Sequence, residues 1–251
     1  MPRFYIPPGA WNIDRLTLDS SESHHCLDVL RMKTGDRATV FDGRGHEATV
    51  EITNTAKGSV ALKVLQHSKS PELACELFLG QAIPKGKNMD LIIEKATELG
   101  AAGIIPLLSE RTVVRLGADE ALDKKGKWQR VAIEAAKQCG RNWLPEVRIP
   151  LTPRQFFDAN EKFDLMLIAS LQPDAQHLKA VLRDHLEAGA PPVRVKPQRV
   201  LVLIGPEGDF TPAELSQAKG AGCRPITLGP IILRTETAAM YCLSVLSHEL
   251  F

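Results

Sequence analysis

Leu-Ile-Gly-Pro-Glu-Gly-Asp-Phe at residues 203–210 and Leu-Gly-Pro-Ile-Ile-Leu-Arg-Thr-Glu-Thr-Ala at residues 228–238 are the two stretches that decide the fold of this chain. Each of them follows an apolar run that is typical of a buried strand. Gly205 and Gly208 have no side chain, so the backbone there can wrap closely around a small molecule. We therefore predict two turns at the edge of an α/β sheet, where open sheets bind their ligands.

The residues after the first turn predict a helix. Thr211 is a suitable N-cap, Pro212 suits the first helical position, and Glu214 completes a capping box. The last segment, residues 237–251, is apolar on nearly every side, which predicts a helix that is buried on several faces. A second subunit would cover one of these faces.

Between residue 72 and the C-terminus, apolar strands alternate with helices, as in a parallel sheet that helices cover on both faces. The predicted strands are residues 76–82, 103–107, 164–170, 200–204 and 225–228. Helices are predicted at residues 88–99, with Asn88 as N-cap, and at residues 128–139. Gly100 and Gly140 end these helices.

The first 71 residues show a different pattern, in which short strands dominate. The predicted strands are residues 3–6, 38–41, 47–52 and 60–65, with a hairpin turn at residues 42–45. One helix, capped by Ser21 or Ser23, interrupts them. The polar segment 66–71 ends in proline and marks a boundary. We predict a small β-barrel domain at residues 1–71 and an α/β domain at residues 72–251.

Composition limits the possible functions. The chain has 251 residues, 44% of them hydrophobic, and a net charge of +1, which argues against nucleic-acid binding by bulk electrostatics. Its apolar runs are too short to span a membrane and its N-terminus lacks a signal-type segment, so we expect a cytoplasmic protein. The cysteines form no Cys-x-x-Cys pair and the histidines show no zinc spacing, so we expect neither disulfides nor metal.

A phosphate-binding loop is one alternative for the ligand site. Residues 80–87, Gly-Gln-Ala-Ile-Pro-Lys-Gly-Lys, are too widely spaced for a P-loop, and Asn88 replaces the expected Ser or Thr. Glu207 in the first turn would repel a phosphate and favour a cationic or hydroxyl-bearing ligand. Both observations disfavour a ligand that is held by its phosphates.

The segment Leu-Arg-Thr-Glu-Thr-Ala at residues 233–238 places a cation, two hydroxyls and a carboxylate before the last helix. In a structural interpretation, Thr235 or Thr237 caps the helix, and Arg234 and Glu236 pair at the surface. In a functional interpretation, the same side chains belong to a ligand site. The segment alone leaves both interpretations open.

Taken together, the motifs resemble those of the ribosomal RNA small subunit methyltransferase E family, and the resemblance covers nearly the whole chain. The motifs are Gly-Pro-Glu-Gly at 205–208, Leu-Gly-x-x-x-Leu-Arg-Thr-Glu-Thr-Ala at 228–238, Val-Leu-Arg-Met at 29–32, Phe-Asp-Gly at 41–43, Glu-Leu-Gly at 98–100, Ser-Glu-Arg at 109–111 and Gln-Cys-Gly-Arg-Asn at 138–142. One departure is Asp209, which stands where many relatives have glycine; a positive φ there would be tolerated by aspartate at some cost.

The resemblance implies a PUA-like β-barrel followed by a SPOUT-type parallel sheet with a C-terminal trefoil knot. Without it, we would expect an ordinary doubly wound sheet. It also implies a homodimer that binds S-adenosylmethionine and methylates N3 of a uridine in 16S ribosomal RNA, either free or in the small ribosomal subunit. By position, the cofactor-binding residues are Leu203, Gly205, Glu207, Gly208, Leu228, Gly229, Leu233, Thr235 and Ala238.

Within the matched motifs, Arg234 and Glu236 are the expected catalytic residues, the first to stabilise the uracil oxygens and the second to accept or position the N3 proton. The expected RNA-binding residues are Arg3, Arg31, Arg111 and Arg141. A non-catalytic RNA-binding dimer that uses the β-barrel is the main alternative. A nucleotide hydrolase is a third, supported by the Gly86–Lys87 pair alone.

Overall fold

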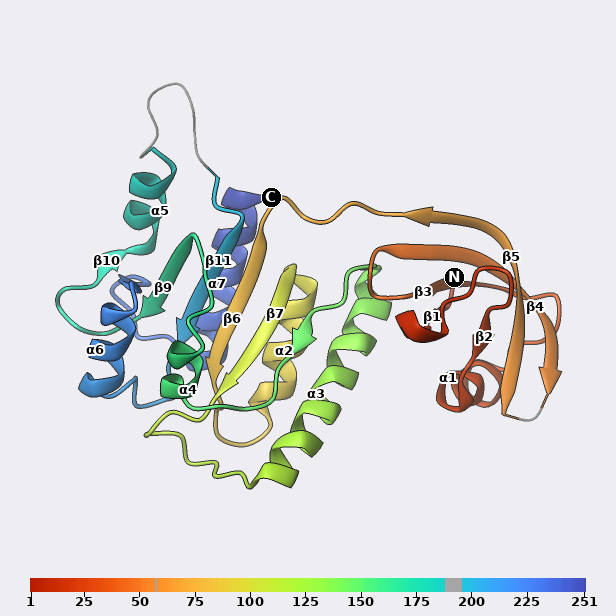
Figure 1. Ribbon diagram of the computed structural model, residues 1–251, viewed down its shortest axis with the longest axis horizontal. Coiled ribbons are helices and arrows are strands. Elements are labelled where there is room, and N and C mark those ends of the chain that lie inside the picture. Colours follow the sequence, from red (N-terminus) through yellow and green to blue (C-terminus); the bar gives the residue numbers. More distant parts are fainter. Residues whose placement is uncertain (57, 188–195) are drawn as a thin grey trace. The chain divides into compact units, whose positions relative to one another are not determined.

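The computed structural model describes residues 1–56, 58–187 and 196–251, which form two compact units (Figure 1). One unit contains Met1–Glu72 together with Ile133–Leu144, and the other contains Leu73–Ala132 and Pro145–Phe251. Residues 133–144 thus pack with the N-terminal strands although they follow much of the α/β unit in sequence. The division into functional domains at residues 1–71 and 72–251 stays a prediction.

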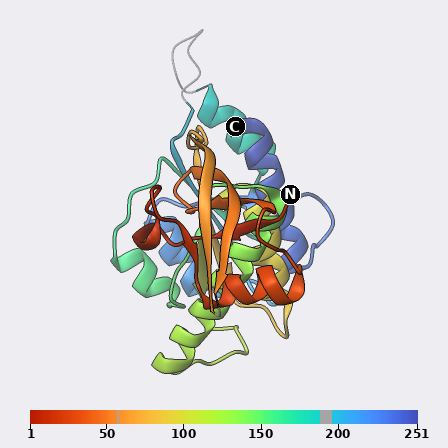
Figure 2. The same ribbon diagram turned by 90° about the vertical axis from the view of Figure 1, so that its right-hand side faces the viewer.

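The first unit is built on a curled five-stranded sheet of order β1-β3-β4-β5-β2 (Figures 1 and 2). Its strands are β1 (Arg3–Tyr5), β2 (Thr17–Leu18), β3 (Arg37–Phe41), β4 (His46–Ala56) and β5 (Ser59–Lys69). β1 runs parallel to β3, and the other neighbours are antiparallel. Fully buried side chains such as Phe4, Val40 and Val50 fill its core. The predicted β module and its 42–45 hairpin are confirmed.

Two details of this unit differ from the sequence-based expectation. The helix α1 (Ser20–His24), which continues as the π-helix η2 (His25–Val29), is capped by Asp19, whose carboxylate accepts the Glu22 amide at 2.8 Å. Ser23 is buried instead, donates to the Leu18 carbonyl and accepts the Val60 amide. The polar segment expected as a linker is largely the end of β5, because it pairs with the start of β4. A short 3-10 helix, η1 (Pro8–Ala10), lies between β1 and β2.

The segment 133–144 is fastened to the strands of the first unit by polar contacts. The ammonium group of Lys137 donates to Glu22 at 2.9 Å, and the Trp143 indole donates to the Ser70 carbonyl at 3.1 Å. Burial raises the pKa of Glu22, although the hydrogen bond from Lys137 works against this rise. The Gly45 amide also donates to the Asn142 carbonyl at 3.0 Å.

The second unit contains a seven-stranded parallel sheet of order β10-β12-β9-β11-β6-β7-β8. Its strands are β6 (Glu76–Ala82), β7 (Ala101–Leu107), β8 (Glu146–Val147), β9 (Leu165–Ala169), β10 (Gln176–His177), β11 (Arg199–Ile204) and β12 (Arg224–Thr227). The five predicted strands are all present. The two-residue strands β8 and β10 were missed because they are too short to show a pattern.

Helices cover both faces of this sheet. They are α2 (Asn88–Glu98), α4 (Pro153–Asp158), α5 (Leu178–Leu186), α6 (Pro212–Gly220) and α7 (Thr235–Leu250). A further helix, α3 (Ala118–Cys139), belongs to this unit up to Ala132 and to the first unit from Ile133. α2 and α7 pack against each other, and α7 contacts β6 and β11. Phe156 of α4 and Leu215 of α6 pack with Leu201 and Leu203 on the opposite face. In the described part of the chain, no helix is both long and apolar enough to cross a bilayer.

The helix ends test the capping predictions. The capping box of Thr211 and Glu214 is formed as predicted, with Pro212 in the first turn. Asn88 is the first helical residue rather than the N-cap, which is Lys87. α7 begins earlier than expected, after Arg234, whose side chain makes no capping hydrogen bond. Thr235 and Thr237, the two expected caps, therefore both lie inside the helix. The Thr235 hydroxyl donates to the Gly205 carbonyl instead.

We predict that Gly45→Ala lowers the free energy of unfolding by ~3 kcal/mol, because it combines a left-handed backbone with a close contact. Gly45 has φ +91°, and a Cβ there would lie 2.7 Å from the Trp143 ring and 2.9 Å from the Ser70 carbonyl oxygen. Gly35→Ala is the matched control, because Gly35 has φ +94° with no atom within 4 Å. Urea unfolding measures the loss of unfolding free energy in each variant. If Gly45→Ala and Gly35→Ala lose the same free energy, the contact with Trp143 does not stabilise this hairpin.

Candidate active site

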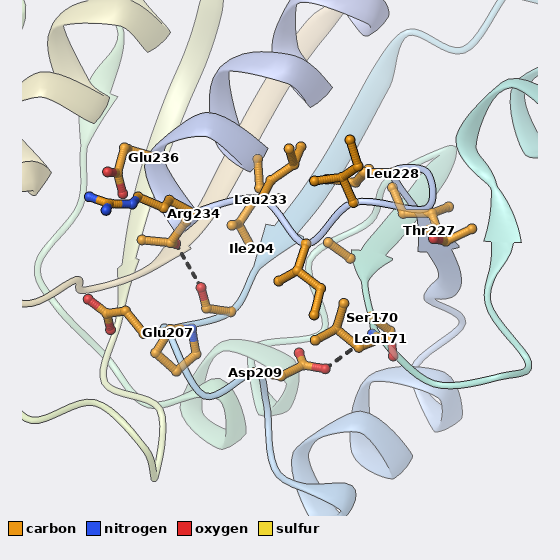
Figure 3. A pocket seen from close by; sticks show the side chains of 18 of the residues that line it. Ser170, Leu171, Ile204, Glu207, Asp209, Thr227, Leu228, Leu233, Arg234 and Glu236 are labelled. Carbon is orange, nitrogen blue, oxygen red and sulfur yellow. Dashed lines mark hydrogen bonds between the residues drawn. The ribbon is translucent and has the colours of Figure 1, made fainter.

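A cavity of about 390 Å³ lies at the carboxyl ends of β9, β11 and β12, formed by the loops that follow these strands and by the start of α7 (Figure 3). This is the edge of the sheet at which the sequence predicted a ligand. The lining residues are Asn88, Ala169, Ser170, Leu171, Ile204, Gly205, Pro206, Glu207, Asp209, Ile226, Thr227, Leu228, Gly229, Ile231, Ile232, Leu233, Arg234, Thr235, Glu236 and Ala238.

Thr235 joins the two turns. Its hydroxyl donates to the Gly205 carbonyl at 2.8 Å and accepts a hydrogen bond of 2.8 Å from the Gln81 amide. Gln81 is fully buried and Thr235 is 6% exposed, so water cannot replace either partner. Gln81 was missed from the sequence, although a polar residue inside the apolar strand at residues 76–82 was a signal that could have found it.

Asp209 ties the first turn to the loop after β9. It has φ +61°, and its carboxylate accepts the Leu171 amide at 3.2 Å and the Phe210 amide at 2.7 Å (Figure 3). Asp209, which stands where many relatives have glycine, therefore adopts a left-handed backbone conformation. The two hydrogen bonds of its carboxylate offset the cost of that conformation. A Cβ at Gly205 would lie 3.2 Å from both the Asp209 carboxylate and the Phe210 nitrogen, so a side chain there would be tightly packed against the turn.

A second buried carboxylate holds the outside of the same turn. Glu214 accepts the Ser109 hydroxyl at 3.1 Å and the Glu110 amide at 2.9 Å, in addition to its bonds with Thr211. The guanidinium group of the next residue, Arg111, donates to the Gly208 carbonyl. The loop after β7 is thereby fixed against the turn from the side that faces away from the cavity.

The charged side chains gather at one end of the cavity. Glu207, Arg234 and Glu236 lie there, while Thr227 and Leu228 lie at the other end (Figure 3). Arg234 is exposed and Glu236 is half-buried. No ion pair joins these two side chains in the described part of the chain, so the surface pair of the structural interpretation is not formed. Glu207 accepts the Lys85 amide at 3.0 Å.

The structure brings most of the predicted cofactor residues into this cavity, together with Arg234 and Glu236. Leu203 and Gly208 do not line it. The Leu203 side chain belongs to the core under α6, because neighbouring residues of a strand face opposite sides, and Ile204 lines the cavity in its place. The residues that reasoning from the sequence missed, such as Ser170 and Leu171, come from the loop after β9, which carries no recognisable motif.

The four arginines predicted to bind RNA differ in their surroundings. Arg3 donates to Glu47 and to Asn142, each at 2.6 Å, and is thus committed to internal contacts. Arg111 is bound to the turn, as described above. Arg141 is half-buried, and burial lowers the pKa of its guanidinium to about 10. Arg31 is exposed, has φ +54°, and makes no hydrogen bond or ion pair within the described residues. All four RNA roles stay predictions.

The chemistry of the cavity fits S-adenosylmethionine. Aliphatic side chains and main-chain groups suit an adenine ring, and Glu207, Asp209 and Glu236 supply negative charge for a sulfonium or an amino group. Arg234 is the one cation among the lining residues, so phosphates would find little to bind. Across the residues that are described, no cluster of three His, Cys, Asp or Glu side chains could hold a metal ion.

Comparisons with known proteins agree with this site. Residues 71–247 match the family model of an RNA methyltransferase domain, and residues 18–65 match that of an RNA methyltransferase PUA domain. The chain is 32% identical over 260 residues to ribosomal RNA small subunit methyltransferase E of Bacillus subtilis, covering 99% of this chain and 97% of that one. The Synechocystis protein of the same name is 34% identical over 232 residues, with 91% and 71% coverage.

Solved structures give the same result. A Legionella pneumophila protein in complex with bound S-adenosylmethionine superposes with a TM-score of 0.86 at 34% identity, covering 98% of this chain and 97% of that one. Ribosomal RNA small subunit methyltransferase E from Neisseria gonorrhoeae, bound to S-adenosyl methionine, gives a TM-score of 0.81 at 29% identity, with 99% and 98% coverage.

The fold and the site thus define an RNA methyltransferase in which a PUA domain precedes an α/β catalytic domain. Within this class, the chain belongs to the ribosomal RNA small subunit methyltransferase E family. The resemblance inferred from the motifs is confirmed, and so is the predicted fold class of a SPOUT-type parallel sheet preceded by a PUA-like sheet, while the trefoil knot stays a prediction.

We predict that Thr235→Val lowers the free energy of unfolding by ~2 kcal/mol, since it removes the acceptor of one of the two hydrogen bonds that the buried Gln81 amide donates and the donor to the Gly205 carbonyl. S-adenosylmethionine should bind more weakly to this variant, because the turn is no longer fastened. Thr235→Ser keeps the hydroxyl and is the control. Calorimetric titration and urea unfolding measure the two effects, and similar behaviour of Val and Ser variants would refute the role of the hydroxyl.

Proposed function

We propose that this protein is an S-adenosylmethionine-dependent methyltransferase that acts on N3 of a uridine in 16S ribosomal RNA. The observation that carries the proposal is the cavity between the two fastened turns, with Arg234 and Glu236 together at one end (Figure 3). Membership of the family, and two similar proteins solved with the same cofactor, support it.

The cofactor would lie in the cavity between the two turns. We assign its binding to Gly205, Glu207, Leu228, Gly229, Leu233, Thr235 and Ala238, which line the cavity, while Leu203 and Gly208 act through the main chain of the turn. When bound, S-adenosylmethionine supplies a methyl group on a positively charged sulfur. The carboxylates near the cavity then have the right sign to hold such a cation.

The chain's own residues must activate the acceptor, because uridine N3 carries a proton at neutral pH. Arg234 is exposed at the mouth of the cavity and would stabilise negative charge on the uracil oxygens as this proton leaves. Glu236 would accept the proton, directly or through a water, and its half-buried position keeps it close to the acceptor. The N3 lone pair would then form the bond to the methyl carbon while the carbon–sulfur bond of the cofactor breaks and its electron pair stays on the sulfur.

The RNA partner is 16S ribosomal RNA, free or within the small ribosomal subunit, and we place the protein in the cytoplasm where this substrate is found. Arg31 is the best supported phosphate ligand because it is exposed and makes no internal bond among the described residues. Arg111 and Arg141 lie in matched motifs and complete the proposed set with Arg3.

We also propose a homodimer and a trefoil knot in the C-terminal part of the chain. Ile231 and Ile232 are each 75% exposed and Leu171 is 62% exposed, all at the rim of the cavity. Such a cluster favours coverage by a second subunit. The hydrogen bond that joins the second turn to the first, and the contacts of α7 with β6 and β11, bring distant segments together and support the proposed knot.

The alternatives receive less support. A non-catalytic RNA-binding dimer would have no use for a cavity in which Arg234 and Glu236 lie beside a methyl-donor-sized space. A nucleotide hydrolase needs cations around phosphates. Gly86 and Lys87 belong to the loop before α2, outside the cavity. Calorimetric titration with S-adenosylmethionine tests the proposal, and absence of binding would reject it.

We expect Arg234→Ala to lower the rate of methyl transfer by ~100-fold while the affinity for S-adenosylmethionine stays nearly unchanged, because the guanidinium acts on the acceptor. Arg154→Ala, at an exposed arginine on α4, is the matched control and should change neither quantity. Single-turnover kinetics measures the rate of methyl transfer, and calorimetry measures the affinity for S-adenosylmethionine. Collapse of cofactor binding would show that Arg234 is structural.

Arg31→Gly should raise the free energy of unfolding by ~1 kcal/mol, because glycine adopts the left-handed backbone without strain. The same variant should bind 16S ribosomal RNA more weakly, with the slope of log K against log salt reduced by about 1. Asn160→Gly, at another left-handed residue, is the control for stability without an effect on RNA. An unchanged salt slope for Arg31→Gly would argue against a phosphate contact.

A further inference from the structure

A second cavity, of about 460 Å³, lies in the first unit and is separate from the cofactor site. It is lined by residues 11–13, which precede β2, and by the facing ends of β4 and β5 at residues 46–47 and 67–68. The proposed methyl transfer uses none of these residues. The cavity lies wholly within the unit that matches a PUA domain, so its geometry does not depend on the other unit.

Two aromatic rings form one wall of this cavity. The rings of Trp11 and His46 are inclined by 27° with their centroids 6.2 Å apart, in a stacked arrangement. Trp11 is half-buried and packs against the core of the first unit, which fixes the plane of its indole. A large aromatic face that is held rigid beside an open cavity is suited to stack with another planar ring.

The His46 ring is fixed by a carboxylate beneath it. Its Nδ1 lies 2.7 Å from the Asp42 carboxylate, which is 4% exposed and also accepts the Arg44 and His46 amides at 2.7 and 3.0 Å. Because Nδ1 is hydrogen-bonded to the Asp42 carboxylate, Nε2 is the ring nitrogen that remains for a ligand. The histidine thus adds a polar atom at a defined position on the edge of the aromatic wall.

The remaining surroundings suit a nucleotide. Ser68 and Asn12 offer a hydroxyl and an amide at the cavity, and the charge of Glu47 is balanced by Arg3 at 2.6 Å. Lys69 pairs directly with His46 across the hairpin, so the two side chains lie on the same face, and Lys69 is exposed. A cation beside an aromatic platform is the combination that binds single-stranded RNA, with the base stacked and the phosphate paired.

We propose that this cavity binds one unpaired nucleobase of the RNA, stacked against Trp11 and His46, with Lys69 close to its phosphate. This inference deepens the proposed function, on which it rests, by assigning to the first unit a contact with a base rather than with phosphates alone. Because every base has an aromatic face, stacking here tolerates different bases, and the contact positions the RNA strand rather than selecting the target.

The test compares two single-stranded probes of equal length, an oligoadenylate and an abasic oligoribonucleotide, by fluorescence anisotropy. Trp11→Ala should lower the affinity for oligoadenylate about tenfold and leave the affinity for the abasic probe unchanged. Trp11→Phe keeps a stacking ring and should retain most of the difference between the probes. Partial unfolding of the variant would lower its affinity for both probes by the same factor, so it would not change the ratio of the two affinities.

Lys69→Ala serves as the second comparison. Loss of a phosphate contact should lower the affinity for both probes and reduce the slope of log K against log salt by about 1. If Trp11→Ala leaves the ratio of the two affinities unchanged, whether or not both affinities fall, the stacking site is overturned. Titration with S-adenosylmethionine tests the proposed function independently. Cofactor binding by Trp11→Ala with an unchanged ratio would reject the stacking site alone, and no cofactor binding by the wild-type protein would reject the methyltransferase.

Discussion

The hydrogen bond from the Thr235 hydroxyl to the Gly205 carbonyl is the contact on which the site depends. It joins two turns that are far apart in sequence, and the buried amide of Gln81 fixes the hydroxyl that makes it. A hydroxyl can donate one hydrogen bond while it accepts another, so threonine serves both partners at once. Because Thr235 is also the first residue of α7, the position of the whole last helix is coupled to the shape of the turn.

The outside of the first turn is held by different chemistry. Glu214 uses both carboxylate oxygens to bind the loop after β7 and the start of α6, and Arg111 reaches the carbonyl of Gly208. Asp209 performs the corresponding role toward the loop after β9. These contacts hold the turn to the loops after β7 and β9 and to the start of α6, so the geometry of the cavity is formed in advance.

The first unit includes a segment that lies far along the chain from the rest of it. Residues 133–144 are fixed to it by the Lys137–Glu22 pair and by the Trp143 indole. The two rings of Trp11 and His46 lie in this same unit, where a buried carboxylate and the hydrophobic core hold them in place. Each unit therefore has a cavity whose lining side chains are held by packing and by hydrogen bonds within the same unit.

The sequence by itself determined the longer strands of both sheets, the capping box at Thr211 and the two turns that line the cavity, because these depend on local periodicity and on residues within a few positions of one another. Only the tertiary structure decided that the Thr235 hydroxyl caps no helix but binds Gly205, that Gln81 supports it, and that residues 133–144 belong to the first unit. These contacts join residues that are distant in sequence, and no local pattern records a partner that folding alone brings near.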